Sequence, residues 1–162
     1  MSDERHNTID GEILIRPAAA EDLSAILAML AGDPLGQMRE HKGADPDTAY
    51  RAAFRDIDCD QRNHILVADR HGEVIGCLQL TFIPGLTYTG RERAQIEGVR
   101  VSEAARGWGI GRRLVDHAVA KAKARGCVLV QLTSDKRRPD AIAFYEALDF
   151  KLSHEGFKLW LS

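Results

Sequence analysis

The sequence predicts one α/β domain built on a mixed β-sheet with flanking helices. Segments with helical periodicity and short apolar runs follow one another in the order β-α-α-β-β-β-α-β-α-β. A strand over 94–101, a long helix and a strand over 127–133 form the pattern of a parallel crossover. The length of 162 residues, 44% of them hydrophobic, suits a single core. We expect residues 1–10 to be disordered and residues 11–162 to form the domain.

The N-terminal part is expected to contribute one strand and two helices. Ile13-Leu14-Ile15 is a short apolar run that Pro17 ends, which is typical of a strand. Residues 18–30 predict the first helix, because apolar side chains recur there at i, i+3, i+4 and i+7. A second helical pattern covers 45–57, after residues 33–46, which have no clear period. We expect these last two segments to form a loop and a helix on the substrate side of the molecule.

A hairpin and a third strand are expected next. Two apolar runs over 64–83 are joined by a polar turn at Arg70-His71-Gly72, which predicts a β-hairpin. The 94–101 strand has Gly98 in its interior, where glycine often marks a β-bulge. The link over 83–95 is irregular and rich in turn residues, so it suits either a substrate pocket or a dimer contact.

Two helices and two strands complete the predicted fold. Residues 109–125 carry apolar side chains every four residues, and Gly126 caps this helix. The 127–133 run is almost unbroken in apolar character, as in a central strand covered on both faces. A short helix begins at Pro139-Asp140, and residues 156–162, GFKLWLS, are expected to close the chain as a strand.

Composition excludes several classes of function. A formal net charge of −2 gives no general attraction for nucleic acid or anionic membrane, so we expect neither as a partner. The N-terminus lacks a signal pattern and no apolar run is long enough to span a membrane, which predicts a cytoplasmic protein. The three cysteines and the scattered histidines lack ligand spacing, so we expect no metal site.

The segment ARGWGIGRRL, residues 105–114, lies between the 94–101 strand and the long helix. A glycine-rich turn at a helix N-terminus presents unpaired N–H groups and the positive end of the helix dipole, which together bind anions. Arg106, Arg112 and Arg113 add charge suited to a pyrophosphate. The alternative is a tight turn whose arginines form a solvated face. Three alternating glycines with an arginine ahead of them favour the anion site.

The glycine segment and one segment downstream of it resemble those of a known family. Residues 106–111, RGWGIG, match R/Q-x-x-G-x-G/A, and RPDAIAFYEALDF is similar to A-x-x-F-Y-x-x-x-G-F. With these motifs the chain resembles the GCN5-related N-acetyltransferase (GNAT) superfamily. One departure is Asp149, where the family has glycine. The resemblance implies a single-domain, mostly antiparallel sheet with a parallel, splayed central strand pair, 94–101 and 127–133, and flanking helices.

The resemblance also implies that acetyl-CoA is the co-substrate. Its pyrophosphate is expected on the backbone N–H groups of the glycine loop, and its pantetheine arm on the backbone of the 94–101 strand. The thioester is expected near Gly98, where a backbone N–H can stabilise the oxyanion. The residues that bind the co-substrate on this interpretation are Val99, Arg100, Val101, Arg106, Gly107, Trp108, Gly109, Ile110, Gly111 and Arg112.

Two residues are expected to carry proton transfer. An amine with a pKa near ~10 must lose a proton before it attacks a thioester, and Glu97 is the candidate base, acting through water. The alternatives are an ordinary outward-facing glutamate or a carboxylate that orients the substrate. Tyr145 occupies the family's general-acid position and would protonate the departing thiolate. Its helical spacing with Ala141, Phe144 and Leu148 also suits a core residue, but the motif match favours the acid role.

The sequence therefore predicts an N-acetyltransferase that transfers acetyl directly to a primary amine in a ternary complex. No cysteine is placed to carry the acyl group. The alternatives are an O-acyltransferase on the same scaffold and a non-catalytic acyl-CoA sensor, which would not need Glu97 or Tyr145. The acceptor is expected to be a small-molecule amine of unknown identity, and the resemblance implies a homodimer as a common assembly.

Overall fold

A computed structural model describes residues 13–32 and 48–161 of the chain. The expected disorder of residues 1–10 and the 33–46 loop lie outside the described residues. The chain divides into two compact units, residues 1–131 and 132–162, and each is described by itself.

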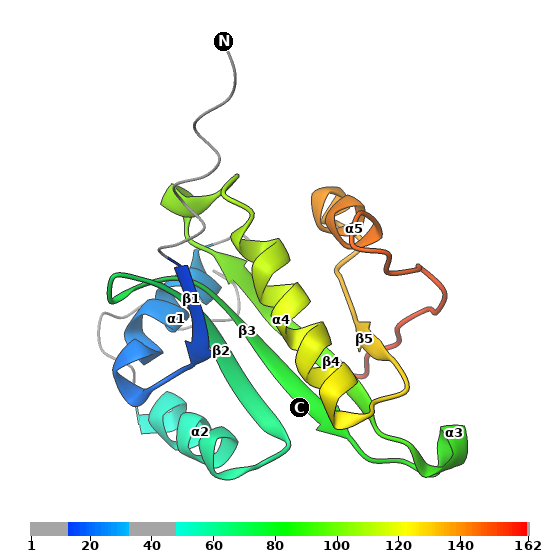
Figure 1. The fold of residues 1–162 in the computed structure, drawn as a ribbon. Helices are drawn as coiled ribbons and strands as arrows, with labels where there is room; N and C mark the ends of the chain where they lie inside the picture. Colours follow the sequence, from blue (N-terminus) through cyan, green and yellow to red (C-terminus); the bar gives the residue numbers. More distant parts are fainter. Residues whose placement is uncertain (1–12, 33–47, 162) are drawn as a thin grey trace. The chain divides into compact units, whose positions relative to one another are not determined.

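The first unit is built on a β-sheet with the strand order β1-β2-β3-β4-β5 (Figure 1). The first four strands are antiparallel: β1 (Ile13–Pro17), β2 (Asn63–Arg70), β3 (Glu73–Ile83) and β4 (Arg93–Val101). β5 (Val130–Leu132) follows β4 in parallel after the crossover helix. The mixed α/β fold expected from the sequence is confirmed.

Helices cover both faces of this sheet. α4 (Ile110–Arg125) lies along one face, where a Cβ on Gly76 would come within 2.9 Å of the Ile110 side chain. α1 (Leu23–Ala31) covers the other face, where Ile26 packs with Val67 and Cys77. Because neighbouring strand residues point to opposite faces, positions 76 and 77 of β3 assign the two helices to opposite sides. α2 (Thr48–Cys59) packs against β2 on the sheet edge that carries β1 (Figure 1).

The expected bulge in β4 is confirmed. In the pairing with β3, Cys77 lies opposite Arg100 and Gln79 lies opposite Glu97, so β4 has one extra residue between these pairs. Gly98 has a φ of +62°, a conformation that other residues rarely adopt. The strand therefore turns its backbone out of the regular ladder directly after Glu97.

One predicted strand is confirmed with shorter bounds, and one prediction is wrong. β5 is shorter than the 127–133 run, and its side chains are half-buried because it is the last strand in the sheet order. Residues 151–161 form no strand, although their pattern favours one. Side chains there, including Phe157 and Trp160, are 95% and 81% exposed. An apolar alternation specifies a strand only where a neighbouring strand supplies hydrogen bonds, and no pairing is found for this segment within the described residues.

The second unit contains the expected short helix, α5 (Pro139–Glu146), which begins with proline at its first turn. The chain leaves it through Asp149, whose φ is +65°. Aspartate thus adopts the left-handed turn for which the family pattern has glycine, and aspartate is among the few residues that tolerate it.

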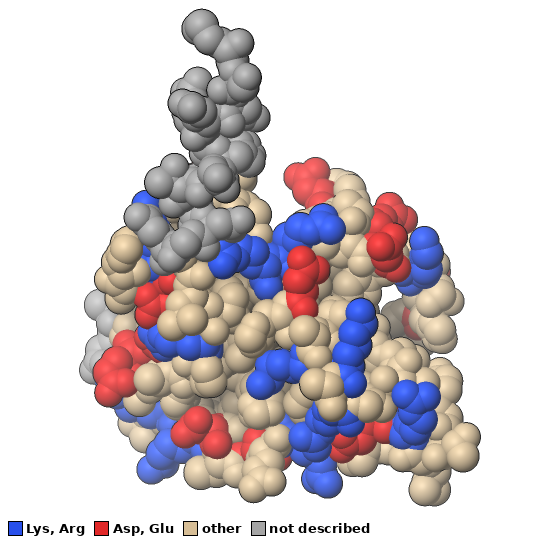
Figure 2. All heavy atoms as spheres, in the orientation of Figure 1, with Lys and Arg blue, Asp and Glu red and all other residues tan. Residues whose placement is uncertain are grey.

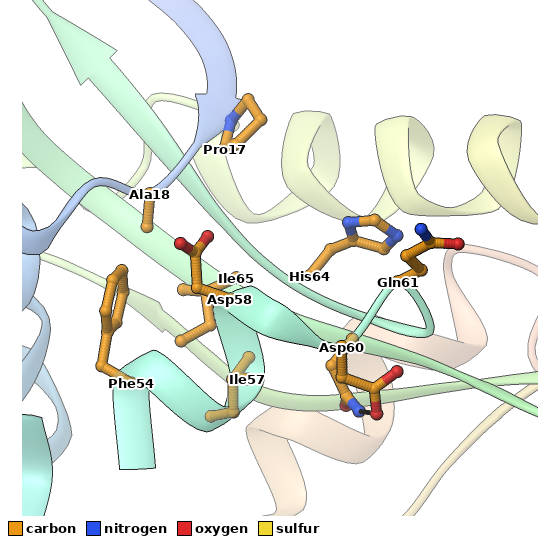
Figure 3. Close-up of a pocket in the computed structure, with 10 residues that line it drawn as sticks. Pro17, Ala18, Phe54, Ile57, Asp58, Asp60, Gln61, His64 and Ile65 are labelled. Atoms are coloured by element: carbon orange, nitrogen blue, oxygen red, sulfur yellow. Dashed lines mark hydrogen bonds between the residues drawn. The ribbon is translucent and has the colours of Figure 1, made fainter. Parts of the chain in front are cut away.

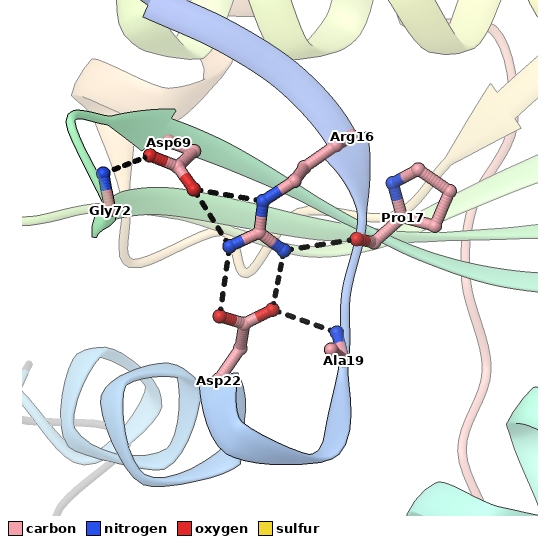
Figure 4. A network of polar contacts seen from close by, with 6 residues as sticks. All are labelled: Arg16, Pro17, Ala19, Asp22, Asp69 and Gly72. Atoms are coloured by element: carbon pink, nitrogen blue, oxygen red, sulfur yellow. Dashed lines mark hydrogen bonds and ion pairs between the residues drawn. The ribbon is translucent and has the colours of Figure 1, made fainter.

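A polar network holds β1, the β2–β3 hairpin and the start of α1 together (Figure 4). The Arg16 guanidinium donates to both oxygens of Asp22, at 2.6 and 3.0 Å, and from Nε to Asp69 at 2.8 Å. Asp22 also accepts the Ala19 N–H at 2.7 Å. The hydrogen bonds from Arg16 lower the pKa of the Asp22 carboxyl below its usual range.

Replacing Arg16 by methionine is expected to lower the free energy of unfolding by about 2–3 kcal/mol, because two largely buried carboxylates lose their cation. Because the pKa of Asp22 is lowered in the folded state, the stabilisation is complete at pH 7 and is lost as the pH falls below about 5. Urea unfolding at pH 7 and at pH 3 measures this. Arg112→Met, which removes an exposed pair to Asp116, is the control. A deficit that is equal at both pH values would refute this origin.

Candidate functional site

The glycine loop, residues 106–109, enters α4 from a 3-10 turn over Glu103–Ala105. Gly107 and Gly109 have φ values of +81° and +74°, and a Cβ on either would meet no heavy atom within 4 Å. The glycines are therefore needed for backbone conformation, and the space beside them is open. Buried Ala105 and Ile110 anchor the loop at its two ends.

The start of α4 presents backbone donors beside this loop. The N–H of Arg113 donates to the Gly109 carbonyl at 3.0 Å, which begins the hydrogen-bond pattern of the helix. The N–H groups of residues 110–112 precede that bond and have no carbonyl four residues earlier in the helix to reach. Backbone N–H groups of this kind, together with the helix dipole, are the groups that bind anions at helix N-termini.

The arginines around the loop have different environments. Arg113 donates from Nη2 to the Ile13 carbonyl at 2.9 Å, so its guanidinium is engaged with β1, unlike the anion-facing charge expected from the sequence. Arg112 is exposed and lies 3.7 Å from Asp116. Arg106 is exposed on the loop itself. Arg106 and Arg112 are therefore the two exposed arginines at this end of the helix.

The middle of the loop is held by an arginine that the sequence reasoning missed. The guanidinium carbon of Arg70 lies 4.9 Å from the centre of the Trp108 ring, a cation–π contact. Arg70 ends β2, directly before the hairpin turn. Its position beside the loop follows from the pairing of β2 and β3, which only the tertiary structure shows.

The bulge in β4 forms the second part of the site. Glu97 is exposed on the strand, and the Leu30 side chain of α1 would lie 3.8 Å from a Cβ on Gly98. The Cys77 Sγ lies 3.8 Å from the Gly98 carbonyl. Burial raises the pKa of the Cys77 thiol to about 12, so this sulfur is a neutral thiol at neutral pH. On the other side of the bulge, Arg100 donates to the Val99 carbonyl at 2.8 Å.

Tyr145 belongs to the second unit, whereas Glu97 and the glycine loop belong to the first. Its ring makes edge-on contacts with Phe144 and Phe150, with centroids 5.0 and 5.9 Å away. The Phe150 N–H donates to the Tyr145 carbonyl at 3.1 Å. The aromatic contacts fix the ring in its own unit, and the side chain is half-buried.

A cavity of about 260 Å³ lies elsewhere in the first unit, between the end of β1, α2 and the start of β2 (Figure 3). Phe54, Ile57 and Ile65 form its apolar wall, and Asp58 and His64 are among its polar lining residues. Six residues of strand separate its lining at residue 64 from Arg70, a span of about 20 Å. The cavity is therefore distinct from the glycine loop.

Charge is distributed evenly over the surface that Figure 2 shows, with lysine, arginine and acidic side chains interspersed. This face therefore gives no general attraction for an anion. The described residues contain no group of three or more histidine, cysteine or acidic side chains placed to hold a metal ion. Among the described helices, none has the length and apolar character that crossing a membrane requires.

Comparison with known proteins identifies acetyltransferases. The model of the Acetyltransferase (GNAT) family matches residues 29–150. A glucosamine 6-phosphate N-acetyltransferase of Trypanosoma brucei brucei is 33% identical over 88 residues, which are 54% of this chain and 58% of that protein. The chain thus spans a little over half of that relative. An aminoalkylphosphonate N-acetyltransferase of Salmonella typhimurium is 28% identical over 143 residues, or 88% of each chain.

Solved structures share the fold. A protein of Bacillus halodurans C-125 described as a transcriptional regulator is 50% identical, with a TM-score of 0.89 over 92% of this chain and 99% of that chain. A Trypanosoma brucei acetyltransferase is 26% identical, with a TM-score of 0.75 over 93% of this chain and 100% of that chain.

Proposed function

This chain belongs to the GNAT family of acetyltransferases, and from that premise we propose that it transfers acetyl from acetyl-CoA directly to a primary amine of a small molecule. The observation that carries the proposal is the glycine loop at the start of α4. Two left-handed glycines, open space beside them and the free N–H groups of the first helical turn suit a pyrophosphate. Arg106 and Arg112 add exposed positive charge to the same end of the helix.

The rest of acetyl-CoA is assigned to β4. An extended pantetheine arm would pair with the backbone of residues 99–101, as an added strand pairs with a sheet edge. The bulge supports this assignment, because the extra residue between Glu97 and Arg100 breaks the regular ladder and frees backbone groups beside Gly98. A freed N–H at this point would stabilise the oxyanion that forms when the amine attacks the thioester.

Direct transfer is supported by the state of Cys77. This cysteine lies against the bulge, where an acyl carrier would have to be. Its thiol is buried and its pKa is raised to about 12, so little thiolate exists to attack a thioester. The reaction then needs both substrates bound at once, with Glu97 removing a proton from the amine through water and Tyr145 protonating the thiolate of CoA.

A second candidate is a non-catalytic acyl-CoA sensor. It is favoured by the description of the Bacillus halodurans protein, 50% identical to this chain, as a transcriptional regulator. A sensor would bind acetyl-CoA at the same loop but would not release CoA in the presence of amines. Transfer to a hydroxyl group in place of an amine is the third candidate, and it is separated from the first by the acceptor that is consumed.

The function is tested by CoA release from acetyl-CoA with a panel of amines and alcohols, together with calorimetric binding of acetyl-CoA. Wild-type protein is expected to release CoA with at least one amine. Arg106→Glu combined with Arg112→Glu is expected to weaken acetyl-CoA binding by about 10–100-fold, as expected for lost charge-assisted contacts. Arg137→Glu, at an exposed arginine paired with Asp135, is the control. Unchanged binding in the double variant would refute the pyrophosphate assignment, and binding without CoA release would identify a sensor.

A further inference from the structure

We propose that the acceptor is an amine that carries hydroxyl groups, such as an amino alcohol or an amino sugar, held by a band of neutral polar side chains beside Glu97. The inference rests on the proposed function and names the class of its acceptor. The band crosses four strands of the sheet in the first unit. We call it the amide band, and it consists of Asn63, Gln79, Thr81, Gln95 and Gln131.

The register of the sheet places the band on one face. Thr81 is paired with Asn63 on one side and with Gln95 on the other, and Gln79 is paired with Glu97. The residues between them, such as Leu80 and Ile96, are buried beneath α4 on the opposite face. The band therefore lies on the face away from α4, and Glu97 belongs to the same row.

Hydrogen bonds fix the polar groups of the band. The Asn63 Oδ1 accepts from Thr81 Oγ1 at 2.7 Å and from Gln79 Nε2 at 3.2 Å. The Gln131 Nε2 donates to Gln95 Oε1 at 2.7 Å. Each of these side chains is half-buried. A sheet face that packed against a core would carry apolar residues here, so pre-oriented amides indicate a surface that binds polar groups.

The chemistry of the band selects the acceptor. Amide and hydroxyl groups both donate and accept, which matches the hydroxyl groups of a substrate. At the β2 end, Asp60 accepts from the Asn63 Nδ2 at 2.8 Å and from the Arg62 N–H at 2.9 Å, so both its oxygens are engaged. On β4, Arg93 lies two residues from Gln95, and its Nη1 approaches Gly85.

No member of the amide band is charged, and Arg93, which continues the row on β4, has its Nη1 beside Gly85 in the link between β3 and β4. Among the described residues of that row, Glu97 is the carboxylate next to the band. A polyamine would be bound by several carboxylates and a phosphonate by cations. One carboxylate beside a row of amides suits one amino group together with several hydroxyl groups. Glu97 then faces the amino group at the bulge, and the amide band holds the hydroxyl groups.

The test compares matched pairs of amines with the full chain. Serinol (2-amino-1,3-propanediol) is compared with isopropylamine, and glucosamine with cyclohexylamine. The kcat/KM of each amine is calculated from the concentration of its unprotonated form. We expect kcat/KM to be at least about tenfold higher for the hydroxylated member of each pair. Gln95→Leu and the isosteric Thr81→Val are each expected to lower kcat/KM for serinol by about tenfold, as for one lost hydrogen bond. Neither should change kcat/KM for isopropylamine or KM for acetyl-CoA.

Gln61→Leu, at an exposed amide outside the band, is the control. It is expected to leave the ratio of kcat/KM between the hydroxylated and the plain amine unchanged in both pairs. If spermidine, 2-aminoethylphosphonate or the plain alkylamines are used as well as the hydroxylated amines, the acceptor class is wrong while the N-acetyltransferase proposal stands. The same holds if the two band variants retain the wild-type ratio. If no amine is acetylated, the proposed function fails, and this inference fails with it.

Discussion

Replacing Tyr145 by phenylalanine is expected to lower kcat by about 10²–10⁴-fold, the usual contribution of general acid catalysis. The ring itself should stay in place, because its contacts with Phe144 and Phe150 involve the aromatic faces and edges and not the hydroxyl group. Affinity for acetyl-CoA should therefore stay within about twofold of the wild type. Steady-state kinetics with a saturating amine, combined with calorimetric binding of acetyl-CoA, measures both quantities.

The control for this variant is Tyr88→Phe, which removes the hydroxyl group of an exposed tyrosine on the link between β3 and β4. It is expected to leave kcat unchanged. A wild-type kcat in Tyr145→Phe would show that this tyrosine is a packing residue, as its helical spacing with Phe144 also allows. A variant that loses acetyl-CoA binding together with activity would instead indicate damage to the binding site.

The sequence predicts most of this fold because its local signals agree with one another. The hairpin turn, the bulge at Gly98 and the two glycines that bound α4 each require a particular backbone conformation, and the structure has it at every one of them. The failure is at the C-terminal strand. Apolar alternation over 157–161 indicates a strand but does not say which strand would pair with it. Pairing is a tertiary property, and single-sequence patterns do not contain it.

The candidate site likewise has parts that the sequence predicts and parts that it does not. The glycine loop can be predicted from the sequence because local backbone geometry requires its residue types. The sequence does not predict the contact of Arg70 with Trp108 or the rows of the amide band, because these join residues that are tens of positions apart. For Arg113 the sequence suggests one partner and the structure shows another. Its place next to the loop in the sequence suggests an anion ligand, but the helix turns its guanidinium to the β1 backbone. Nearness in sequence does not fix the direction of a side chain on a helix.

Replacing Glu97 by glutamine is expected to lower kcat/KM for the amine by about 10²-fold near pH 7, because the protonated amine then lacks a base. The deficit should shrink as the pH rises toward the amine pKa of about 10, since free amine becomes abundant without the enzyme's help. A carboxylate that only orients the neutral amine by a hydrogen bond predicts a deficit that stays constant with pH. The pH profile of kcat/KM for both proteins therefore separates the two roles of an exposed residue whose position alone suits either.

Glu73→Gln provides the matched control, because Glu73 is also an exposed strand glutamate but lies at the hairpin turn, on β3 and not on β4. It should retain the wild-type profile. The register of the sheet makes this comparison specific: Glu97 is opposite Gln79 of the amide band and directly precedes the bulge, whereas Glu73 is opposite Arg70. A base must lie where the amine and the thioester meet, and of these two carboxylates only Glu97 adjoins the one-residue bulge between β3 and β4. If Glu97→Gln kept full activity over the whole pH range, the amine would have to lose its proton to another group or directly to solvent.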